Sequence, residues 1–333
     1  MEETQQPPGS GPRPKVVVLT APGTPPPYNA AALEEDADVV HADAEGLADV
    51  LGGAQVLFVW DFFSTALRDA WPRADALEWV HVAAAGVDSL LFDALRTSDV
   101  EVTNAHGAFD GPIAEFVLAS VLAHDKQLHT SKDLQRRGVW QHREVVRTAG
   151  QRALVVGTGG IGRATARLLR AVGLDVRGAG RTARDEDPDF GTVVPSAELA
   201  EHAEWADHLV LIAPLTEDTR GLVGTEVLAR MRPSAHLVNV GRGALVDEPA
   251  LVDALRSGSI AAASLDVFDE EPLPGDHPFW RLENVHVSAH MSGDVVGWRD
   301  TLADQFAENL ARWRAGEQLL NRVDKDLGYV RRN

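Results

Sequence analysis

A glycine-rich turn constrains the fold of this chain more than any other sequence feature. The strand-like run Ala153–Val156 leads into it, a helical pattern follows over Ala164–Val172, and a second strand-like run covers Leu174–Ala179. In such a βαβ unit the glycines allow a tight turn, and the helix N-terminus directs free N–H groups at a pyrophosphate. The alternative is a turn in an α/β domain that binds no phosphate. The strand–turn–helix–strand context favours a dinucleotide site formed by Gly157, Gly159, Gly160, Ile161 and Gly162.

The end of the second strand indicates which dinucleotide would bind. An NAD site usually has an Asp or Glu there, roughly 20 residues on, that accepts hydrogen bonds from the ribose hydroxyls. Gly180 is the best estimate of that place here, so no carboxylate repels a 2′-phosphate. Guanidinium groups recognise phosphate well. The sequence therefore predicts that NADP(H) is preferred, with NAD(H) possible, and that the 2′-phosphate is bound by Arg181, Thr182 and Arg184. The alternative is that these arginines are ordinary surface charges. Three neighbouring carboxylates also weaken the local positive field, those of Asp185, Glu186 and Asp187.

Composition excludes several classes of protein. A length of 333 residues suggests two domains, with the 44% hydrophobic and 24% charged fractions of a globular protein. The chain has no run of about 18 apolar residues, so no membrane helix is expected. The absence of cysteine excludes disulfides, thiolate metal sites and a Cys nucleophile, and we expect no metal site. A net charge of −19 without a long Lys/Arg run argues against nucleic-acid binding.

The two ends of the chain and its periodicity predict the architecture. Residues 1–14 are polar, lack the apolar core of a signal peptide and are expected to form a disordered tail in a cytoplasmic protein. Helices are expected over Ile113–Leu128, Glu248–Ser257 and Val295–Gly316. Alternating strands and helices imply parallel, doubly wound α/β sheets. The other predicted strands are Lys15–Thr20, Gln55–Trp60, Trp79–Ala83, Val100–Thr103, His208–Ile212, His236–Val240, Ala261–Asp266 and Val285–Ser288.

Three residues near strand ends, after the glycine turn, carry suitable chemistry. They are Arg242, Glu271 and His290, and ligands of open α/β sheets bind outside the carboxyl ends of the strands. A nicotinamide cofactor implies hydride transfer, which builds negative charge on a ketone oxygen and requires a proton donor and a cation beside it. A carboxylate bound to histidine stabilises the imidazolium. Each residue alone also fits a structural or surface role, whereas together they fit an acid, its orienting carboxylate and a substrate anchor.

At these segments the sequence resembles the D-isomer-specific 2-hydroxyacid dehydrogenase family. The similarity runs from Pro214–Thr216 through Asn239–Gly243 to Leu265–Phe268 and covers nearly the whole chain beyond the tail. It implies that His290 is the acid/base, Glu271 its partner and Arg242 the substrate anchor. It also implies a substrate loop whose backbone N–H groups hold a carboxylate, at Ala85, Gly86 and Val87. Further cofactor contacts are implied for Ala213, Pro214, Thr219, Val240, Gly241, Asp266 and Gly293.

The resemblance implies domains, partners and an activity as well. A flavodoxin-like substrate domain would comprise residues 15–106 and 295–333, with a Rossmann cofactor domain inserted as residues 107–294. Family members are commonly homodimers through the cofactor domain. Gly180-Arg181 and Trp60–Phe63 are similar to the NADP-using glyoxylate/hydroxypyruvate reductases, while Ser288-Ala289-His290 replaces the frequent Thr-Pro-His. Reduction of small 2-oxo acids to D-2-hydroxy acids is therefore expected. The alternatives are a dinucleotide-sensing, corepressor-like protein and a phosphoglycerate dehydrogenase-like enzyme.

Overall fold

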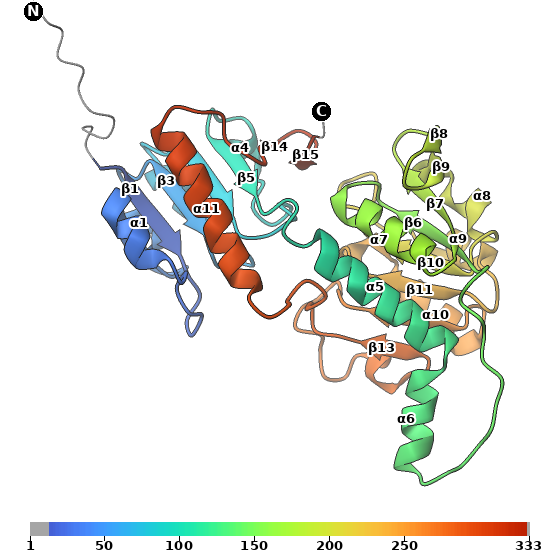
Figure 1. Cartoon of the computed structure of the whole chain (residues 1–333). Coiled ribbons are helices and arrows are strands. Elements are labelled where there is room, and N and C mark those ends of the chain that lie inside the picture. Colours follow the sequence, from blue (N-terminus) through green and yellow to red (C-terminus); the bar gives the residue numbers. More distant parts are fainter. Residues whose placement is uncertain (1–12, 332–333) are drawn as a thin grey trace, which may run out of the picture. The chain divides into compact units, whose positions relative to one another are not determined.

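The computed structural model describes residues 13–331 (Figure 1). The predicted tail, residues 1–14, lies outside this range except for its last two residues. The chain divides into two compact units: one takes the described chain up to His106 and from Gly297 onward, and the other is Gly107–Val296. Each contains a parallel sheet, which confirms the predicted α/β fold class. Over the described residues, no helix is both long and apolar enough to cross a membrane.

The first unit contains a five-stranded parallel sheet in the order β2-β1-β3-β4-β5. β3 and β4 are buried along their whole length, as expected for apolar runs covered on both faces. The strands predicted from the sequence did not include β2, an edge strand of sequence DVVHA in which no residue is buried. The strands are β1 Lys15–Leu19, β2 Asp38–Ala42, β3 Val56–Val59, β4 Trp79–Val82 and β5 Glu101–Asn104. The helices are α1 Ala30–Asp36, α2 Leu47–Val50, α3 Ala66–Ala70, α4 Asp93–Arg96 and α11 Trp298–Arg314, and a small hairpin joins β14 Val323–Asp324 and β15 Tyr329–Val330.

Helix α11 returns from the far end of the chain to complete the core of the first unit. Phe306 stacks on Phe58 of β3, with ring centroids 4.0 Å apart, and on Trp79 of β4 at 5.3 Å. Leu302 and Leu310 are buried on the same stripe. The helix begins at Trp298 rather than at the predicted Val295, after Gly297, whose φ is +83°.

The second unit contains an eight-stranded sheet in the order β13-β12-β11-β10-β6-β7-β9-β8. All pairs are parallel except β8 with β9, a hairpin at the edge. The sequence patterns missed this hairpin because its first strand, Arg-Asp-Glu-Asp, is mostly exposed and charged. The strands are β6 Arg152–Val156, β7 Asp175–Gly180, β8 Arg184–Asp187, β9 Gly191–Pro195, β10 His208–Leu211, β11 His236–Asn239, β12 Ala262–Leu265 and β13 Val285–Val287. The helices are α5 Asp110–Asp125, α6 Leu128–Arg136, α7 Gly160–Ala171, α8 Leu199–Ala203, α9 Thr225–Arg230 and α10 Glu248–Ser257.

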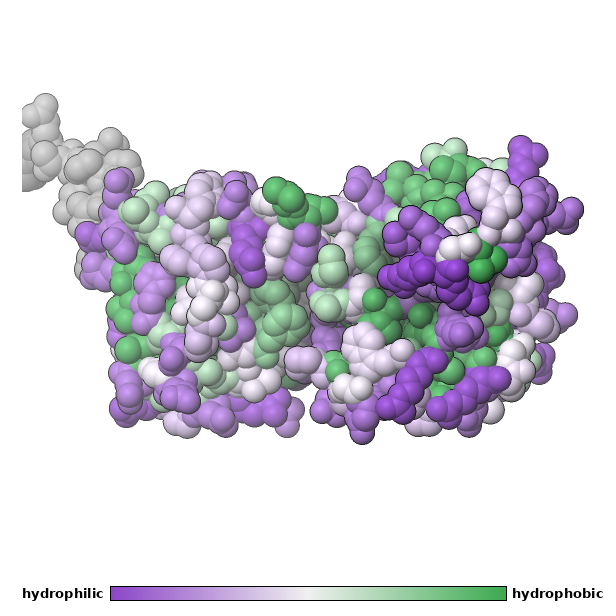
Figure 2. Space-filling model, turned by 90° about the horizontal axis from the view of Figure 1, so that it is seen from below, coloured by the Kyte–Doolittle hydropathy of each residue, from purple (hydrophilic) through white to green (hydrophobic). Residues whose placement is uncertain are grey.

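The helix predicted over Ile113–Leu128 corresponds to α5, and the following helix, α6, was not predicted. α5 ends at Asp125, and Gln127 adopts a left-handed conformation with φ of +49° before α6 begins at Leu128. An α-helix does not continue through such a residue. Apolar side chains reach the surface of both units (Figure 2), and Trp140, in the segment after α6, is fully exposed.

Candidate functional site

The predicted phosphate-binding turn lies between β6 and α7, and two of its glycines are sterically required. Gly157 has a φ of +115°, and a Cβ on it would lie 2.8 Å from the backbone N of Ala213. A Cβ on Gly162 would lie 1.9 Å from the Gly157 carbonyl oxygen. Around Gly159, by contrast, a Cβ would meet no atom within 4 Å. The turn is thus packed on its inner side and open above Gly159 at the N-terminus of α7, which suits a pyrophosphate.

The loops after β10 and β11 adjoin this turn. These strands follow β6 in adjacent positions of the sheet, and a Cβ on Gly241 would lie 3.1 Å from the Ala213 carbonyl oxygen. In the β10 loop the Thr219 hydroxyl donates to the Pro214 carbonyl at 2.7 Å. The structure therefore gathers five predicted cofactor contacts at the carboxyl ends of adjacent strands, where such sheets bind ligands: Ala213, Pro214, Thr219, Val240 and Gly241.

Gly180 is the last residue of β7, and the predicted 2′-phosphate ligands follow it. A Cβ at Gly180 would lie 3.1 Å from the Thr158 hydroxyl oxygen, so a larger residue would need a small shift of Thr158. Arg181 and Thr182 are exposed. Arg184 forms an ion pair with Asp187, with Nε 3.3 Å from Oδ2. A 2′-phosphate would therefore compete with this carboxylate for Arg184.

Asp187 is held mainly by Arg163, on the first turns of α7. The Arg163 guanidinium lies 2.9 Å from Asp187 and 2.7 Å from Asp189. Burial alone would raise the pKa of Asp187, but the hydrogen bond and charge of Arg163 outweigh it and lower this pKa to about 2. The acidic hairpin is consequently tied to the glycine-turn helix by the ion pairs of Arg163 with Asp187 and Asp189.

Glu271 and His290 form the closest predicted catalytic pair. The Glu271 Oε2 atom lies 2.6 Å from His290 Nδ1, and the Phe268 N–H donates to Oε1 at 2.9 Å. Burial would raise the pKa of Glu271, but hydrogen bonds from His290 and Phe268 and the charges of His290 and Arg242 lower it. The His290 side chain is 32% exposed, so a ligand can reach the ring.

The turn that carries His290 is organised by the buried carboxylate of Asp266. His290 has a φ of +50°, an unusual conformation for a histidine, and its N–H donates to the Asp266 carbonyl at 2.8 Å. The Asp266 carboxylate accepts from the Ser288 hydroxyl at 2.6 Å and from the N–H groups of Met291 and Ser292 at 3.0 and 2.8 Å. Asp266 thus fixes the His290 turn, while its predicted contact with a nicotinamide stays a prediction.

Arg242 follows β11 in a turn fixed by Asn239. The Asn239 amide donates to the Arg242 carbonyl at 2.9 Å and accepts from the Gly241 N–H at 3.1 Å. Next to it, a Cβ on Gly243 would lie 1.9 Å from the Phe268 carbonyl carbon, so the loops after β11 and β12 touch. Arg242, Glu271 and His290 all belong to the second unit, and the charge of Arg242 contributes to the lowered pKa of Glu271. Gly293 follows His290 in the sequence and packs closely against Phe109, because a Cβ on Gly293 would lie 2.6 Å from the Phe109 ring.

The predicted substrate loop belongs to the first unit and is held by the end of β5. The Asn104 amide donates to the Ala85 carbonyl at 2.6 Å, and the Ala105 N–H donates to the Ala84 carbonyl at 2.9 Å. Val87 is buried, whereas Ala85 and Gly86 are partly exposed. The loop is therefore anchored at its start and accessible where the resemblance places the substrate.

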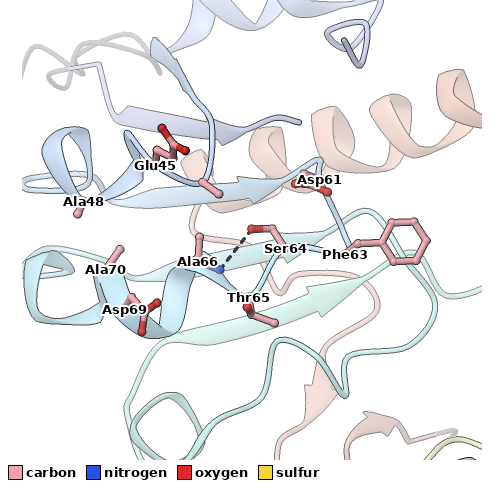
Figure 3. A pocket seen from close by; sticks show the side chains of 10 residues that line it. Glu45, Ala48, Asp61, Phe63, Ser64, Thr65, Ala66, Asp69 and Ala70 are labelled. Carbon is pink, nitrogen blue, oxygen red and sulfur yellow. Dashed lines mark hydrogen bonds between the residues drawn. The ribbon is translucent and has the colours of Figure 1, made fainter. Parts of the chain in front are cut away.

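The first unit also has a hollow of about 590 Å³ (Figure 3). Its lining includes the carboxylates of Glu45, Asp61 and Asp69, and burial raises the pKa of Asp61. Asp61 and Phe63 belong to the segment that is similar to the glyoxylate/hydroxypyruvate reductases, but none of the predicted site residues lines the hollow. Carboxylates repel an anionic oxo acid, so this hollow is not a candidate for the substrate.

Sequence reasoning missed three residues that position the site: Asn104, Asn239 and Ser288. Each is a small polar residue at or just after the carboxyl end of a strand, beside a predicted functional segment. That location was a usable signal, because short polar side chains hydrogen-bond to nearby backbone groups. Across residues 13–331, no group of three or more His, Asp or Glu residues is arranged to hold a metal ion.

Comparisons with known proteins show the family to which the chain belongs. A family model described as D-isomer specific 2-hydroxyacid dehydrogenase, NAD binding domain, matches residues 118–292. Glyoxylate reductase from Korarchaeum cryptofilum (strain OPF8) is 33% identical over 273 residues, which cover 79% of this chain and 81% of that protein.

Two solved structures match over almost the whole chain. A D-isomer specific 2-hydroxyacid dehydrogenase from Xanthobacter autotrophicus Py2, in complex with NADPH and MES, is 33% identical with a TM-score of 0.77, covering 94% of this chain and 99% of that one. NADPH-dependent glyoxylate/hydroxypyruvate reductase from Sinorhizobium meliloti, in complex with NADP and sulfate, is 28% identical with a TM-score of 0.80, covering 96% and 100%. The chain belongs to the D-isomer specific 2-hydroxyacid dehydrogenase family, and residues 118–292 correspond to the NAD(P)-binding domain of that family.

Proposed function

We propose that this protein reduces small 2-oxo acids, of the size of glyoxylate or hydroxypyruvate, to D-2-hydroxy acids with NADPH as the preferred cofactor. The observation that carries the proposal is the 2.6 Å contact of Glu271 with His290 in the unit that also holds Arg242 and the glycine turn. Relatives named glyoxylate reductase and a solved NADPH-dependent glyoxylate/hydroxypyruvate reductase support the substrate class.

His290 is proposed as the proton donor to the carbonyl oxygen. Its Nδ1 faces Glu271, which directs Nε2 away from the carboxylate and makes Nε2 the donating atom. Because its pKa is lowered, Glu271 stays ionised and orients the ring through a charge-assisted hydrogen bond. The nicotinamide, when bound, supplies the hydride. Arg242 would bind the carboxylate and polarise the carbonyl oxygen, since a guanidinium offers a planar pair of donors.

The glycine turn and the end of β7 are proposed to hold the cofactor. The open side of the turn at Gly159 admits a pyrophosphate at the N-terminus of α7. Gly180 presents no carboxylate to a 2′-phosphate, and Arg181 with Thr182 would bind that phosphate. In the first unit, backbone N–H groups of Ala85, Gly86 and Val87 would hold the substrate carboxylate.

A homodimer through the cofactor-binding unit is proposed as the working assembly. The segment after α6, residues 137–148, exposes several apolar side chains: Trp140 is fully exposed, and Val139, Val145 and Val146 are each nearly half exposed. Exposed apolar groups gathered on one segment indicate an interface, and a second copy of this chain is the proposed occupant. Light scattering of the wild type and of Trp140→Ser tests this assembly, since the substitution should yield a monomer if the segment mediates pairing.

The activity is tested by following NADPH absorbance with the purified protein and a panel of 2-oxo acids, including phosphorylated and longer ones. We expect turnover with glyoxylate or hydroxypyruvate and a product of D configuration where the product is chiral. NADPH binding without turnover of any panel member would instead support a dinucleotide-sensing protein. Preference for a phosphorylated oxo acid would indicate a phosphoglycerate dehydrogenase-like enzyme.

A further inference from the structure

Five imidazole side chains form one cluster in the second unit, and the proposed chemistry uses none of them. This histidine cluster comes from α5, α6, β10, β11 and β13 and consists of His124, His129, His208, His236 and His286. The strand residues His208 and His236 open β10 and β11. These strand starts lie at the end of the sheet opposite to the carboxyl ends that carry the predicted site.

The inner part of the cluster is buried. His208 and His236 are paired in the parallel register of β10 and β11, so both side chains face the same side of the sheet. They are 1% and 0% exposed, and their Nδ1 atoms share a hydrogen bond at 3.4 Å. His208 Nε2 lies 3.3 Å from Asp125 of α5, and His236 Nε2 lies 2.9 Å from the Ser264 hydroxyl.

The outer part of the cluster consists of two imidazole stacks. His124, at the end of α5, stacks on His236 with ring centroids 4.4 Å apart and planes 9° apart. His129, in the first turn of α6, stacks on His286 of β13 with centroids 3.5 Å apart and planes 17° apart. The second stack therefore joins α6 directly to the sheet.

Within one chain, few other contacts hold α6 in place. Leu134 is its one buried residue, and the helix has nine residues, fewer than the roughly 12–15 that an isolated helix needs to be even marginally stable. The segment that follows depends on it, because Arg143 donates to the Gln127 carbonyl and to the Ser131 hydroxyl. If α6 leaves the sheet, it should also unfold and release this segment.

If the rings of the outer stack were protonated, few nearby carboxylates would balance their positive charge. Burial, together with the charges of His129 and His124, lowers the pKa of His286 to about 4, and only Asp133 acts in the opposite direction. Burial also lowers the pKa of His129, again opposed by Asp133. These rings are consequently neutral at neutral pH.

The inner groups add to the imbalance. Burial, followed by the charge of His208, lowers the pKa of His124, and Asp125 opposes the shift. Burial and the four neighbouring histidines lower the pKa of His236 far below its ordinary value. Asp125 and Asp133 are thus the two carboxylates whose charge favours protonation of the neighbouring imidazoles, and Asp125 is already engaged by His208.

We propose that the stack of His129 on His286 is an acid-sensitive latch, which holds α6 on the sheet at neutral pH and releases it on mild acidification. Two neutral imidazoles stack favourably, whereas two imidazolium ions 3.5 Å apart repel each other. Protonation of these imidazoles alone would open the latch. The segments that would leave the sheet are α6 and residues 137–148.

The sign and size of the effect follow from proton linkage. The docked state binds fewer protons than the released state between pH 6.5 and about 4, so docking weakens as pH falls through this range. For His286 alone, the ratio of released to docked α6 would rise about tenfold between pH 8 and pH 5.5. Because these rings are partly exposed and solvent screens them, we expect roughly three- to tenfold.

The experiment is amide hydrogen exchange by mass spectrometry on the full chain at pH 8 and pH 5.5. Protection factors, corrected for the intrinsic exchange rate at each pH, are compared for peptides within Leu128–Arg136 and within Gly160–Ala171. In the wild type, protection of α6 should fall roughly three- to tenfold at pH 5.5 while α7 stays constant. Unchanged protection of α6 would overturn the proposal without bearing on the reductase activity.

Variants separate the latch from general acid sensitivity. His286→Phe keeps an aromatic stack that cannot be protonated, so α6 should keep its protection at both pH values. His129→Phe does the same from the exposed side of the stack and avoids any disturbance of the sheet. His202→Phe, on α8 outside the cluster, should retain the wild-type pH dependence. If both stack variants still lose α6 protection at pH 5.5, the histidine stack is not the latch.

Discussion

His290 and the histidine cluster belong to the same unit, yet their surroundings assign them opposite tasks. His290 lies 2.6 Å from one carboxylate, and 32% of its side chain is exposed. His236, in contrast, is 0% exposed, and burial together with four neighbouring imidazoles lowers its pKa far below the ordinary value. A ring that is accessible and paired with a carboxylate can give a proton to a ligand. A ring that is buried among other imidazoles stays neutral and makes the fold itself sensitive to acid.

The largest expected effect breaks this comparison at His290. His290→Ala should reduce turnover of the oxo acid by about 10²–10⁴-fold, because a positioned general acid contributes about that much, while NADPH binding is retained. His277→Ala is the matched control, since His277 lies 3.5 Å from Glu248 in the same unit but outside the proposed site. Steady-state kinetics measure the turnover of the oxo acid, and a binding titration measures the dissociation constant of NADPH. Near-normal turnover of the His290 variant would end its assignment as the acid.

Cofactor choice is expected to show the next largest effect. Arg181→Ala should weaken NADPH binding by roughly tenfold to a hundredfold and leave NADH almost unchanged, since a hydrogen bond to a charged group contributes about 1.5–3 kcal/mol. Arg184→Ala should matter less, because Arg184 already pairs with Asp187. Adding Gly180→Asp to Arg181→Ala should then favour NADH. Equal kcat/KM values for NADPH and NADH in the wild type would show that these arginines are surface charge.

Arg242→Lys should lower kcat/KM for the oxo acid by about tenfold, because the lysine keeps the charge but loses the planar pair of donors. We expect a higher KM for the oxo acid and lower turnover, with the NADPH dissociation constant little changed. Arg220→Lys, on the loop after β10, serves as the control. A collapse of NADPH binding with unchanged substrate terms would make Arg242 a dinucleotide ligand instead.

The smallest expected effect concerns stability in acid. The pKa values of His81 and His286 are lowered to about 3 and about 4, chiefly by burial, so the folded chain binds fewer protons than the unfolded chain below pH 6.5. His81, which is fully buried, should therefore reduce the free energy of unfolding by about 1.4 kcal/mol between pH 8 and pH 5.5, and the partly exposed His286 by less. Urea unfolding at the two pH values should show the loss, and His81→Phe should remove part of it. Equal stability at both pH values would contradict the burial argument.

The sequence predicts the glycine turn and the proposed catalytic residues far better than it predicts the buried histidines of the sheet. The glycine turn and the strand ends with Arg242, Glu271 and His290 are local patterns, and parallel strands bring such ends together by geometry alone. The structure places these segments in one unit, as that reasoning requires. The roles assigned to the individual residues stay predictions until the variants are measured.

The histidine cluster could not be foreseen in the same way. Its members lie on five elements, and their meeting depends on the register of β10 with β11 and on the break between α5 and α6 at Gln127. The predicted helix ended at Leu128, where α6 begins, so the apolar pattern missed both this break and α6. The β8–β9 hairpin was missed for a related reason, since a charged edge strand held by Arg163 carries no apolar alternation.

The central claim is that the Glu271–His290 pair delivers a proton during NADPH-dependent reduction. The most direct test is turnover with a 2-oxo acid at one pH for the wild type, Glu271→Gln and His290→Gln. The account predicts that turnover falls in Glu271→Gln, where no ionised carboxylate orients the ring, and falls further in His290→Gln, while both variants still bind NADPH. Wild-type turnover in either variant would contradict it.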